Sequence, residues 1–346
     1  MRIRVWGATV WSVLVVVVAS TLSAGSLSAA PFPGAGISAR YTDTAVINSV
    51  PTFGAISGFD RIGPNKFALI SADVGRSGPA RFFTGRVNYL SDVVGFSSNP
   101  VVGGGGLILG PGNTLLAPGS AQFEGIRKVG GGYVVVSGGA HQFIRIQGSG
   151  GSYIRDLPLP VAWQPGKTTG LIGQRGLTGV AVGPRGQISV LTAGGLKQDP
   201  ATSARLLVLG KGANTKGRGT AAEYVYKTDP GQVAADVLAF NNTDYLVLER
   251  GKGRATELFW TTIAGADQVG GRVKLGGTER AMSKRLLFTT ARVPFMKTGN
   301  MAGLAWGNWA PDDPTLDYRS RALFVVTNNV FAGPTLVQSF EIRLPR

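Results

Sequence analysis

The 346-residue sequence contains no cysteine and a single histidine, His141. Without cysteine the chain has no disulfide, no thiolate nucleophile and no Cys-ligated zinc or iron–sulfur site. With one histidine, no Ser-His-Asp triad and no histidine-rich metal site can be assembled from recognisable motifs. A GxSxG elbow, a P-loop and a dinucleotide-binding fingerprint followed by a helix are also missing. These absences remove the sequence signatures of the commonest hydrolases, nucleotide-binding enzymes and dehydrogenases.

Charge is scarce and glycine is abundant. Charged residues make up only 16% of the chain, whereas glycine occurs 52 times. Long helices are disfavoured by this composition, because each glycine costs roughly 1 kcal/mol relative to alanine inside a helix. Many short strands joined by tight turns fit it better. At this length the chain buries a sizeable core without needing covalent crosslinks.

The first 30 residues have the order of a secretory signal, with basic residues, then an apolar run and then small residues. The apolar run covers residues 5–19 and the small residues cover 20–30. We expect cleavage between Ala24 and Ala30, and export to the periplasm, the cell wall or the medium. An uncleaved anchor is the alternative, because the apolar run is long for a signal. The folded domain is expected over residues 40–346.

Basic residues outnumber acidic ones by 35 to 19. Removal of Arg2 and Arg4 with the signal would lower the formal charge from +16 to about +14. Such an excess attracts polyanions, which predicts an anionic small molecule or an anionic envelope polymer as partner. Peripheral contact with a membrane fits the same charge, and no specific nucleic-acid partner is expected. Because the basic residues are scattered, general surface adhesion without a specific ligand is an equal alternative.

A weak unit recurs five times, and each copy is typical of a β-hairpin. It consists of a glycine and an apolar residue, a turn, and an apolar strand that closes on Ser or Thr. The copies cover residues 56–71, 124–137, 178–192, 237–249 and 302–327. Gly, Pro, Asn or Asp build the turns in GPNK, KVGGG, GPRG and NNTD. The fourth copy ends in Glu rather than Ser or Thr, and the fifth contains a longer insertion.

Further strands follow the hairpins, in QFIRI, RLLVL, AEYVYK, ELFWTTI and TLVQSFEI. Four strands per unit are typical of a propeller blade, and a closed ring leaves no long exposed edge. The sequence therefore predicts a single-domain, all-β propeller of five or six blades, closed by pairing residues 44–50 with 335–342. A large β-sandwich is the alternative fold. The four glycines at 103–106 and the segment 211–220 are predicted to be long loops.

Several short motifs carry a family resemblance: FEGIR, IRDLPLP, LVLER, NMAGLAWG, GLKQD before RLLVL, and TNNVF near the C-terminus. Over residues 50–343 the chain resembles the bacterial phytase-like (esterase-like) family of exported propellers. The resemblance implies a β-propeller with a loose link to phosphoester or ester hydrolysis. It also implies acidic residues before the glycine that opens each unit and after the residue that closes its second strand. Carboxylates that converge from several blades suit calcium, and a bound metal polarises water for attack.

Most of these acidic positions hold other residues in this chain. The replacements are Ala72, Gln122, Gly138, Thr178, Ala193, Ala302 and Asn328. The acids that remain, which we predict as metal ligands if a calcium site survives, are Asp73, Glu124, Asp199 and Glu249. Among them Glu124 and Glu249 are the candidate catalytic residues. The predicted ligand-binding residues are Arg127, Lys197, Arg250 and Asn328. No cofactor is expected unless the residual acidic site binds calcium.

Each of these residues also has a purely structural interpretation. Glu124 with Arg127, and Glu249 with Arg250, would form ion pairs that hold a blade together. Asp199 would cap a turn, Asn328 would belong to an ordinary turn, and His141 would lie at a solvated strand edge. The missing acids favour a non-catalytic module that binds anionic ligands or acts as a scaffold at the cell envelope. A metal-assisted phosphoester or ester hydrolase is the alternative function, so enzymatic activity stays an open question.

Overall fold

The computed structural model describes residues 36–92, 94–210 and 221–346. The predicted signal segment and the loop predicted for residues 211–220 lie outside the described residues. Helix within these ranges is limited to four short 3₁₀ segments, at Pro111–Asn113, Val161–Trp163, Gly173–Arg175 and Thr290–Arg292. None of the described helices has the length and hydrophobicity needed to span a membrane.

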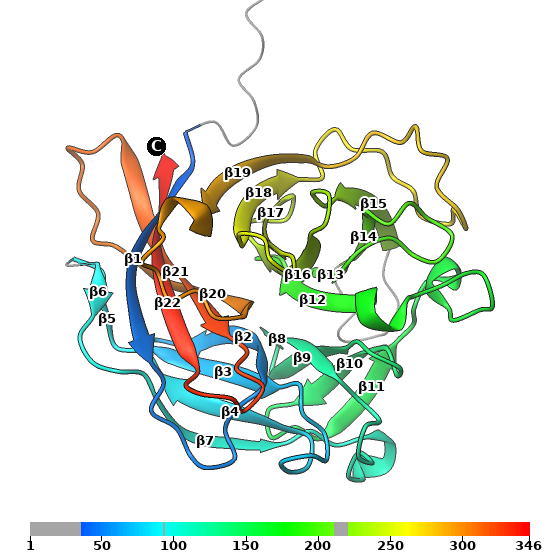
Figure 1. The fold of residues 1–346 in the computed structure, drawn as a ribbon, viewed down its shortest axis with the longest axis horizontal. Coiled ribbons are helices and arrows are strands. Elements are labelled where there is room, and N and C mark those ends of the chain that lie inside the picture. The colour runs from blue at the N-terminus through cyan, green and yellow to red at the C-terminus, as the bar shows by residue number, and fades with distance from the viewer. Residues whose placement is uncertain (1–35, 93, 211–220) are drawn as a thin grey trace, which may run out of the picture. The chain divides into compact units, whose positions relative to one another are not determined.

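In the part of the chain that the structure describes, the strands form five antiparallel four-stranded sheets, which are the blades of a propeller (Figure 1). The first blade contains β2 (Ile56–Gly63), β3 (Lys66–Ser71), β4 (Arg81–Arg86) and β7 (Val101–Leu107). The second contains β8 (Phe123–Val129), β9 (Gly132–Ser137), β10 (Phe143–Gly148) and β11 (Tyr153–Leu157). The third contains β12 (Leu177–Val182), β13 (Ile188–Thr192), β14 (Ser203–Leu209) and β15 (Ala221–Lys227).

The fourth blade contains β16 (Val233–Ala239), β17 (Asp244–Arg250), β18 (Glu257–Thr262) and β19 (Ser283–Thr289). The fifth contains β20 (Met301–Trp309), β21 (Tyr318–Thr327), β22 (Leu336–Pro345) and β1 (Ser38–Val46). A small hairpin of β5 (Tyr89–Leu90) and β6 (Gly95–Phe96) extends from the first blade. The propeller prediction is confirmed, and so are all five predicted hairpins.

The ring closes through the fifth blade. Its outer strand β1 comes from the N-terminal part of the domain and pairs with β22, so that Tyr41 lies opposite Phe340. The prediction that these two segments pair is confirmed, although β1 begins at Ser38 and the strand proper ends at Val46. The composite sheet completes the fifth repeat and adds no sixth blade, which settles the blade number at five in the described residues.

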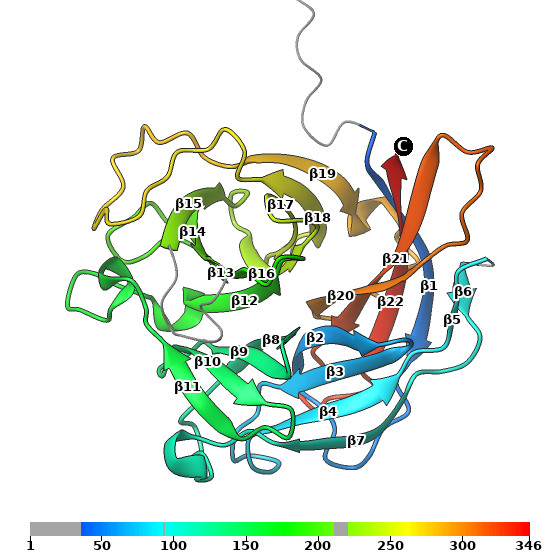
Figure 2. The same cartoon turned by 180° about the vertical axis from the view of Figure 1, so that it is seen from behind.

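The inner strands β2, β8, β12, β16 and β20 gather around the middle of the ring when it is viewed along its short axis (Figures 1 and 2). Near the start of four of these five inner strands, the backbone of a glycine packs directly against the next inner strand. A Cβ added at Gly58 would lie 2.7 Å from the backbone nitrogen of Ile126. At Gly179 it would lie 2.8 Å from the backbone nitrogen of Val237. Glycine therefore recurs here because neighbouring blades approach each other too closely for a side chain.

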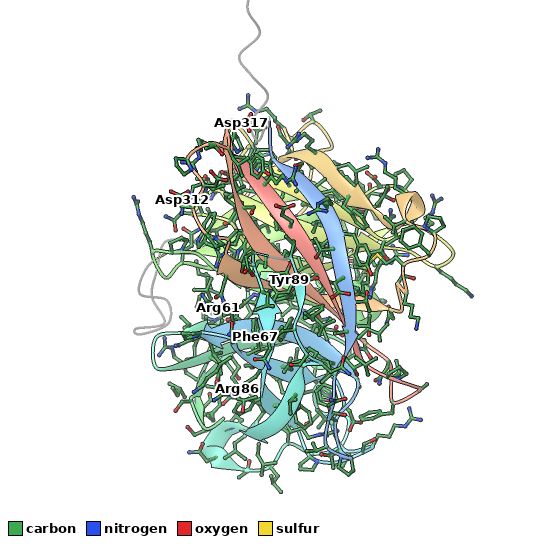
Figure 3. All side chains as sticks on the ribbon, turned by 90° about the vertical axis from the view of Figure 1, so that its left-hand side faces the viewer. Arg61, Phe67, Arg86, Tyr89, Asp312 and Asp317 are labelled. Atoms are coloured by element: carbon green, nitrogen blue, oxygen red, sulfur yellow. The ribbon has the colours of Figure 1, made fainter. Side chains whose placement is uncertain are left out.

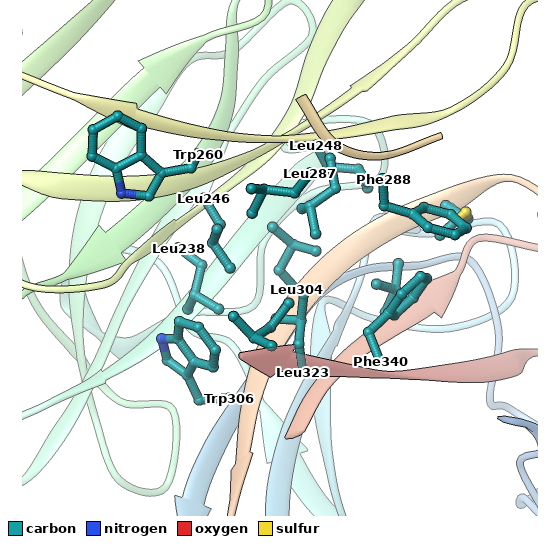
Figure 4. Packing of buried hydrophobic residues seen from close by; sticks show 14 of the residues in the cluster. Leu238, Leu246, Leu248, Trp260, Leu287, Phe288, Leu304, Trp306, Leu323 and Phe340 are labelled. Carbon is teal, nitrogen blue, oxygen red and sulfur yellow. The ribbon is translucent and has the colours of Figure 1, made fainter. Parts of the chain in front are cut away.

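Apolar residues from facing sheets form one cluster at each of the five interfaces between described blades. The interface between the fourth and fifth blades is shown in Figure 4, where Leu246 and Trp260 of one blade face Leu304, Leu323 and Phe340 of the other. The alternation of strand side chains places these residues between the blades. The core is thus divided around the ring, as expected for radial packing of sheets.

The prediction of a loop at residues 103–106 is wrong, because these four glycines form part of strand β7. They pair with β4, and Gly105 lies opposite Phe83 with a φ of +151°. A Cβ at Gly105 would lie only 2.1 Å from the carbonyl oxygen of Phe82. Glycine has a low intrinsic preference for strands. It occurs in β7 because the neighbouring strand approaches so closely that no side chain fits.

Candidate functional site

Each inner hairpin contains a β-bulge beside its opening residue, where the pairing register slips by one. The bulged residues of the five blades are Ser57, Glu124, Thr178, Ala235 and Ala302. They occupy equivalent places at one end of the inner strands, which we call the bulge end of the propeller. Glu124 is the one carboxylate among them, so the acids implied by the resemblance are absent from four of these five places.

A second set of equivalent positions follows the second strand of each blade at the same end. In the pairing register these are Ala72, Gly138, Ala193, Arg250 and Asn328. The fourth blade therefore presents a guanidinium where the resemblance implies a carboxylate. Glu249 precedes Arg250 and takes the place that Ser or Thr has in the other blades. Ten equivalent positions at the bulge end thus carry one acid and one base.

Glu124 and Arg250 lie close enough to interact electrostatically at this end. Burial raises the pKa of the Glu124 carboxyl to about 7, although a hydrogen bond from Gln122 and the charge of Arg250 oppose the rise. Burial also lowers the pKa of Arg250. Arg250 donates a hydrogen bond to the side chain of Asn300. A carboxyl group that titrates near neutral pH beside a cation is suited to general acid–base chemistry.

Asp236 stands where the other inner strands have their opening glycine, and it forms a buried ion pair with Arg127 at 2.8 Å. The two side chains are 0% and 2% exposed. Asp236 also accepts hydrogen bonds from the backbone amides of Val237 and Leu304. Burial raises the pKa of Asp236 to about 6 even though Arg127 lowers it. Because the pair joins the second and fourth blades, which are not neighbours, it crosses the centre of the ring.

Both terminal nitrogens of the Arg127 guanidinium donate hydrogen bonds at the centre of the propeller. It donates to the carbonyl oxygens of Phe59, Ile126 and Val237 as well as to Asp236. The predicted pairing of Glu124 with Arg127 is therefore wrong, because the arginine side chain turns to the axis. Arg127 is predicted to bind a ligand, but its side chain lies inside the fold and away from solvent.

Three of the four predicted metal ligands are held by other protein groups. Asp73 pairs with Arg81 at 3.2 Å, and Asp199 pairs with Arg205 at 2.7 Å. Glu249 is fully buried and pairs with Lys284 at 2.7 Å. It also accepts hydrogen bonds from the Tyr226 hydroxyl and the Asp229 amide. The predicted Glu249–Arg250 ion pair is therefore wrong, because the two side chains leave the strand on opposite faces.

The remaining predicted residues occupy separate places. Lys197 donates to the carbonyl oxygen of Gly166 at 2.7 Å. The Asn328 side chain accepts from the amide of Val330, which is the turn contact named as its structural alternative. His141 is exposed just before β10, as its structural interpretation predicts. Of the predicted ligand-binding residues, Arg250 is the one that lies beside Glu124.

Calcium requires six to eight oxygen ligands gathered around one point. Within residues 36–92, 94–210 and 221–346, no three His, Cys, Asp or Glu side chains are grouped closely enough to hold a metal ion. The four predicted ligands are distributed over four blades, and the carboxylate at the axis, Asp236, is already paired with Arg127. These residues do not fit a calcium centre of the kind that the resemblance implies.

A polar cavity of about 330 Å³ opens at the bulge end between the fourth and fifth blades. Its polar and charged lining residues include Arg250, Lys252, Arg254, Thr256, Thr290 and Asn300. In the described part of the chain, none of the three cations forms an ion pair with a carboxylate within 4 Å. We call this feature the cationic cavity. Its volume is at the lower end of the range typical of small-molecule sites.

Sequence reasoning missed Asp236, Lys252 and Arg254. A signal for Asp236 exists, because one acid interrupts the otherwise apolar strand VAADVLA at the place of the repeat's glycine. The segment RGKGR, which follows the fourth hairpin, contains all three cations of the cavity at alternate positions. Their convergence with Thr290 and Asn300 depends on contacts between two blades and has no local signal.

The fold and the site together define a five-bladed propeller whose bulge end carries one carboxyl group beside a cationic cavity. The profile of the family described as "Phytase-like: Esterase-like activity of phytase" matches residues 51–329, and the chain belongs to this family. No curated protein sequence matches the chain.

Solved structures give weak matches. A glucose dehydrogenase is 12% identical with a TM-score of 0.35, covering 86% of this chain and 84% of that chain. A second glucose dehydrogenase structure is 13% identical with a TM-score of 0.36, covering 80% and 78%. A subtype N11 neuraminidase-like protein of A/flat-faced bat/Peru/033/2010 (H18N11) is 10% identical with a TM-score of 0.37, covering 88% and 93%.

Proposed function

We propose that this phytase-like propeller binds an anionic ligand in the cationic cavity and acts as a binding or scaffold module of the cell envelope. One observation carries the proposal: Arg250, Lys252 and Arg254 share one cavity without forming an ion pair to a described carboxylate. Unpaired like charges repel one another, so an anion that enters the cavity relieves repulsion as well as gaining attraction. Threonine hydroxyls and Asn300 supply neutral donors around the same space.

Phosphate or carboxylate groups are the ligand chemistry that such a cavity favours. Arginine offers paired N–H donors that match two oxygens of an oxyanion, and lysine adds a compact charge. The ligand is a small molecule or the anionic group of an envelope polymer. The basic excess of the chain favours its approach from solution.

Calorimetric titration with inorganic pyrophosphate at low ionic strength tests this function. We expect saturable binding that weakens about tenfold, equivalent to about 1.4 kcal/mol, in Arg250→Gln. Lys252→Gln should weaken binding less, because the Lys252 side chain is exposed to solvent. Arg185→Gln removes an exposed charge from a turn at the opposite end of the third blade, so it is the matched control. Equal losses in all three variants would mean general charge attraction and would reject a specific site.

The alternative function is hydrolysis of an ester or phosphoester, and the observation that favours it is the raised pKa of Glu124 beside the cavity. A carboxyl group that titrates near pH 7 can donate or accept a proton during attack by water. Glu249, the other candidate catalytic residue, is buried and bound to Lys284 and Tyr226, so it cannot reach a substrate. Hydrolysis of p-nitrophenyl acetate and p-nitrophenyl phosphate should be measured for the parent protein and for Glu124→Gln. A rate that the substitution lowers more than tenfold would establish the enzyme, and equal rates would reject it.

A further inference from the structure

Two arginines approach each other at the end of the propeller opposite the bulge end. Arg61 lies near the end of β2, and Arg321 lies on β21 opposite Trp309 of β20. Burial and, to a smaller extent, the charge of Arg61 lower the pKa of Arg321 to about 10. Within the described ranges neither guanidinium forms an ion pair with a carboxylate. Two cations held together in this way destabilise the folded protein unless something compensates them.

Few of the donors on these two side chains have protein acceptors. An arginine side chain carries five N–H donors. Arg321 donates from Nε to the carbonyl oxygen of Gly307 at 3.2 Å. Arg61 donates from one terminal nitrogen to Asn308 Oδ1 at 2.7 Å, while its buried Nε has no partner among the described residues. Most of the donor capacity of the pair is therefore available to a ligand.

Aromatic side chains and a hydrogen-bonded asparagine fix the geometry of the pair. The Arg321 guanidinium lies 4.6 Å from the ring centre of Trp306 and 5.3 Å from that of Trp309. Trp306 is anchored in the interface of the fourth and fifth blades by donating to the carbonyl oxygen of Ala239 (Figure 4). Asn308 is held in turn by Asn65 at 3.0 Å. Such stacking orients a guanidinium without neutralising its charge.

Asp60 precedes Arg61 but accepts from the backbone amide of Lys128, and the acidic residues nearest to Arg321 along the chain belong to the β20–β21 loop. Asp312 pairs with Arg346 at 2.8 Å and with Arg319 at 3.5 Å. Asp312 and Asp317 lie well apart from Arg61 in the side view of Figure 3. Trp309 is 43% exposed, so solvent reaches the edge of the cluster. The two guanidinium groups are therefore held in fixed positions by protein contacts, at a place that solvent reaches.

We propose that Arg61 and Arg321, oriented by Asn308, Trp306 and Trp309, form a second anion site that binds a phosphate group. Each guanidinium directs N–H donors at separate oxygens of the tetrahedral ion, in the paired geometry that arginine offers to phosphate. The negative charge offsets the repulsion between the two cations. This site is independent of the cationic cavity, because it lies at the other end of the inner strands and shares no residue with it.

Titration with inorganic phosphate at constant ionic strength tests the proposal, with tryptophan fluorescence and the unfolding midpoint as readouts. We expect saturable binding in the millimolar range and a rise in the midpoint, because phosphate binds only the folded chain. Arg61→Gln and Arg321→Gln should each weaken binding about tenfold or more. Arg86→Gln is the matched control, because Arg86 is exposed at the same end and has no described ion pair. All of these titrations use an Arg250→Gln background, because the cationic cavity is itself proposed to bind phosphate.

Stability without phosphate provides a second and independent measure. Arg61→Gln keeps an amide donor for Asn308 and removes the like charge, so the midpoint in phosphate-free buffer should stay equal or rise by a degree or two, on the order of 0.5 kcal/mol. An arginine kept only for stability would give the reverse, and a clear fall in the midpoint would overturn the proposal. In the Arg250→Gln background, a phosphate response that survives in the Arg61→Gln/Arg321→Gln double variant would overturn it as well.

Discussion

Asp236 and Glu124 occupy adjacent steps of the same structural repeat, yet their surroundings differ. Asp236 takes the place of an opening glycine and is buried at the axis, where Arg127 and two backbone amides bind its oxygens. Glu124 takes the neighbouring bulged position, where it receives one side-chain hydrogen bond and faces Arg250 beside a cavity. Both groups have raised pKa values because burial disfavours the charged form.

The difference between them separates a structural carboxylate from one available for function. Every oxygen of Asp236 is engaged with protein donors from the second, fourth and fifth blades. Replacing Asp236 would therefore disturb contacts among these three blades. Glu124 has spare hydrogen-bonding capacity and lies next to the cavity cations. A buried carboxyl group thus stabilises the fold at one position and keeps free acceptor capacity at the other.

The largest expected effect on stability comes from breaking the buried ion pair between Arg127 and Asp236. Arg127→Met leaves the Asp236 carboxylate buried without its cation, which should cost about 3–5 kcal/mol in the free energy of unfolding at pH 7.5. Urea denaturation measures this loss. The loss should shrink toward pH 5, because protonation of Asp236 removes the unpaired charge.

The Arg127→Met/Asp236→Asn double variant is the control for this effect. The amides of Val237 and Leu304 donate to different oxygens of Asp236, and asparagine keeps an acceptor for one of them, so part of the lost stability should return. A double variant that is less stable than Arg127→Met would show that the carboxylate itself, and not its pairing with Arg127, supports the axis.

An intermediate effect is expected from Glu124, through the pH dependence of stability. Its pKa is about 7 in the folded protein against 4.5 in an exposed glutamate, so the folded state binds the proton more tightly. The contribution of Glu124 to the free energy of unfolding is therefore fully present below about pH 4.5 and is lost as the pH rises through 7. The loss should be on the order of 1–3 kcal/mol, given about 1.4 kcal/mol per pKa unit.

Glu124→Gln should flatten this part of the stability profile between pH 4.5 and 7. The remaining slope belongs to Asp236, whose raised pKa of about 6 has the same sign. Chemical denaturation at several pH values gives both profiles. Identical slopes for the two proteins would mean that Glu124 is solvated like an ordinary surface acid.

The smallest expected effect is the response to calcium. The described acids are spread over several blades and are bound by Arg81, Arg205 and Lys284, so calcium finds too few free oxygens. The unfolding midpoints with millimolar calcium and with chelator should agree to within about one degree. A rise of several degrees that Glu124→Gln abolishes would restore a metal site and favour the hydrolase.

Local sequence was sufficient to predict the repeated hairpins. In the first, GPNK places Asn65 in the left-handed region at a φ of +52°, which asparagine tolerates better than most residues. Alternating apolar strands then fix which side chains enter the interfaces. The equivalence of Glu124, Thr178 and Ala302 also followed from the repeat, and the bulges confirm it.

Local sequence does not show which charged residues pair with each other, because the partners lie far apart along the chain. Arg127 lies three residues after Glu124, yet it binds Asp236, which is 109 residues away. Glu249 is followed by Arg250, yet it binds Lys284 of another strand. Neighbouring residues on a strand point to opposite faces, so adjacent charges in sequence rarely pair.

The sequence by itself determined an all-β chain of five similar units, because turn residues and strand periodicity act over a few residues. It also determined which residues stand at the positions where the family resemblance implies acids, because these positions recur in each unit. Only the tertiary structure decided that β1 completes the fifth blade, that an ion pair fills the axis, and that cations from RGKGR enter a cavity with residues of the next blade. These outcomes depend on the curvature and closure of the ring, which are set by packing between sheets distant in sequence.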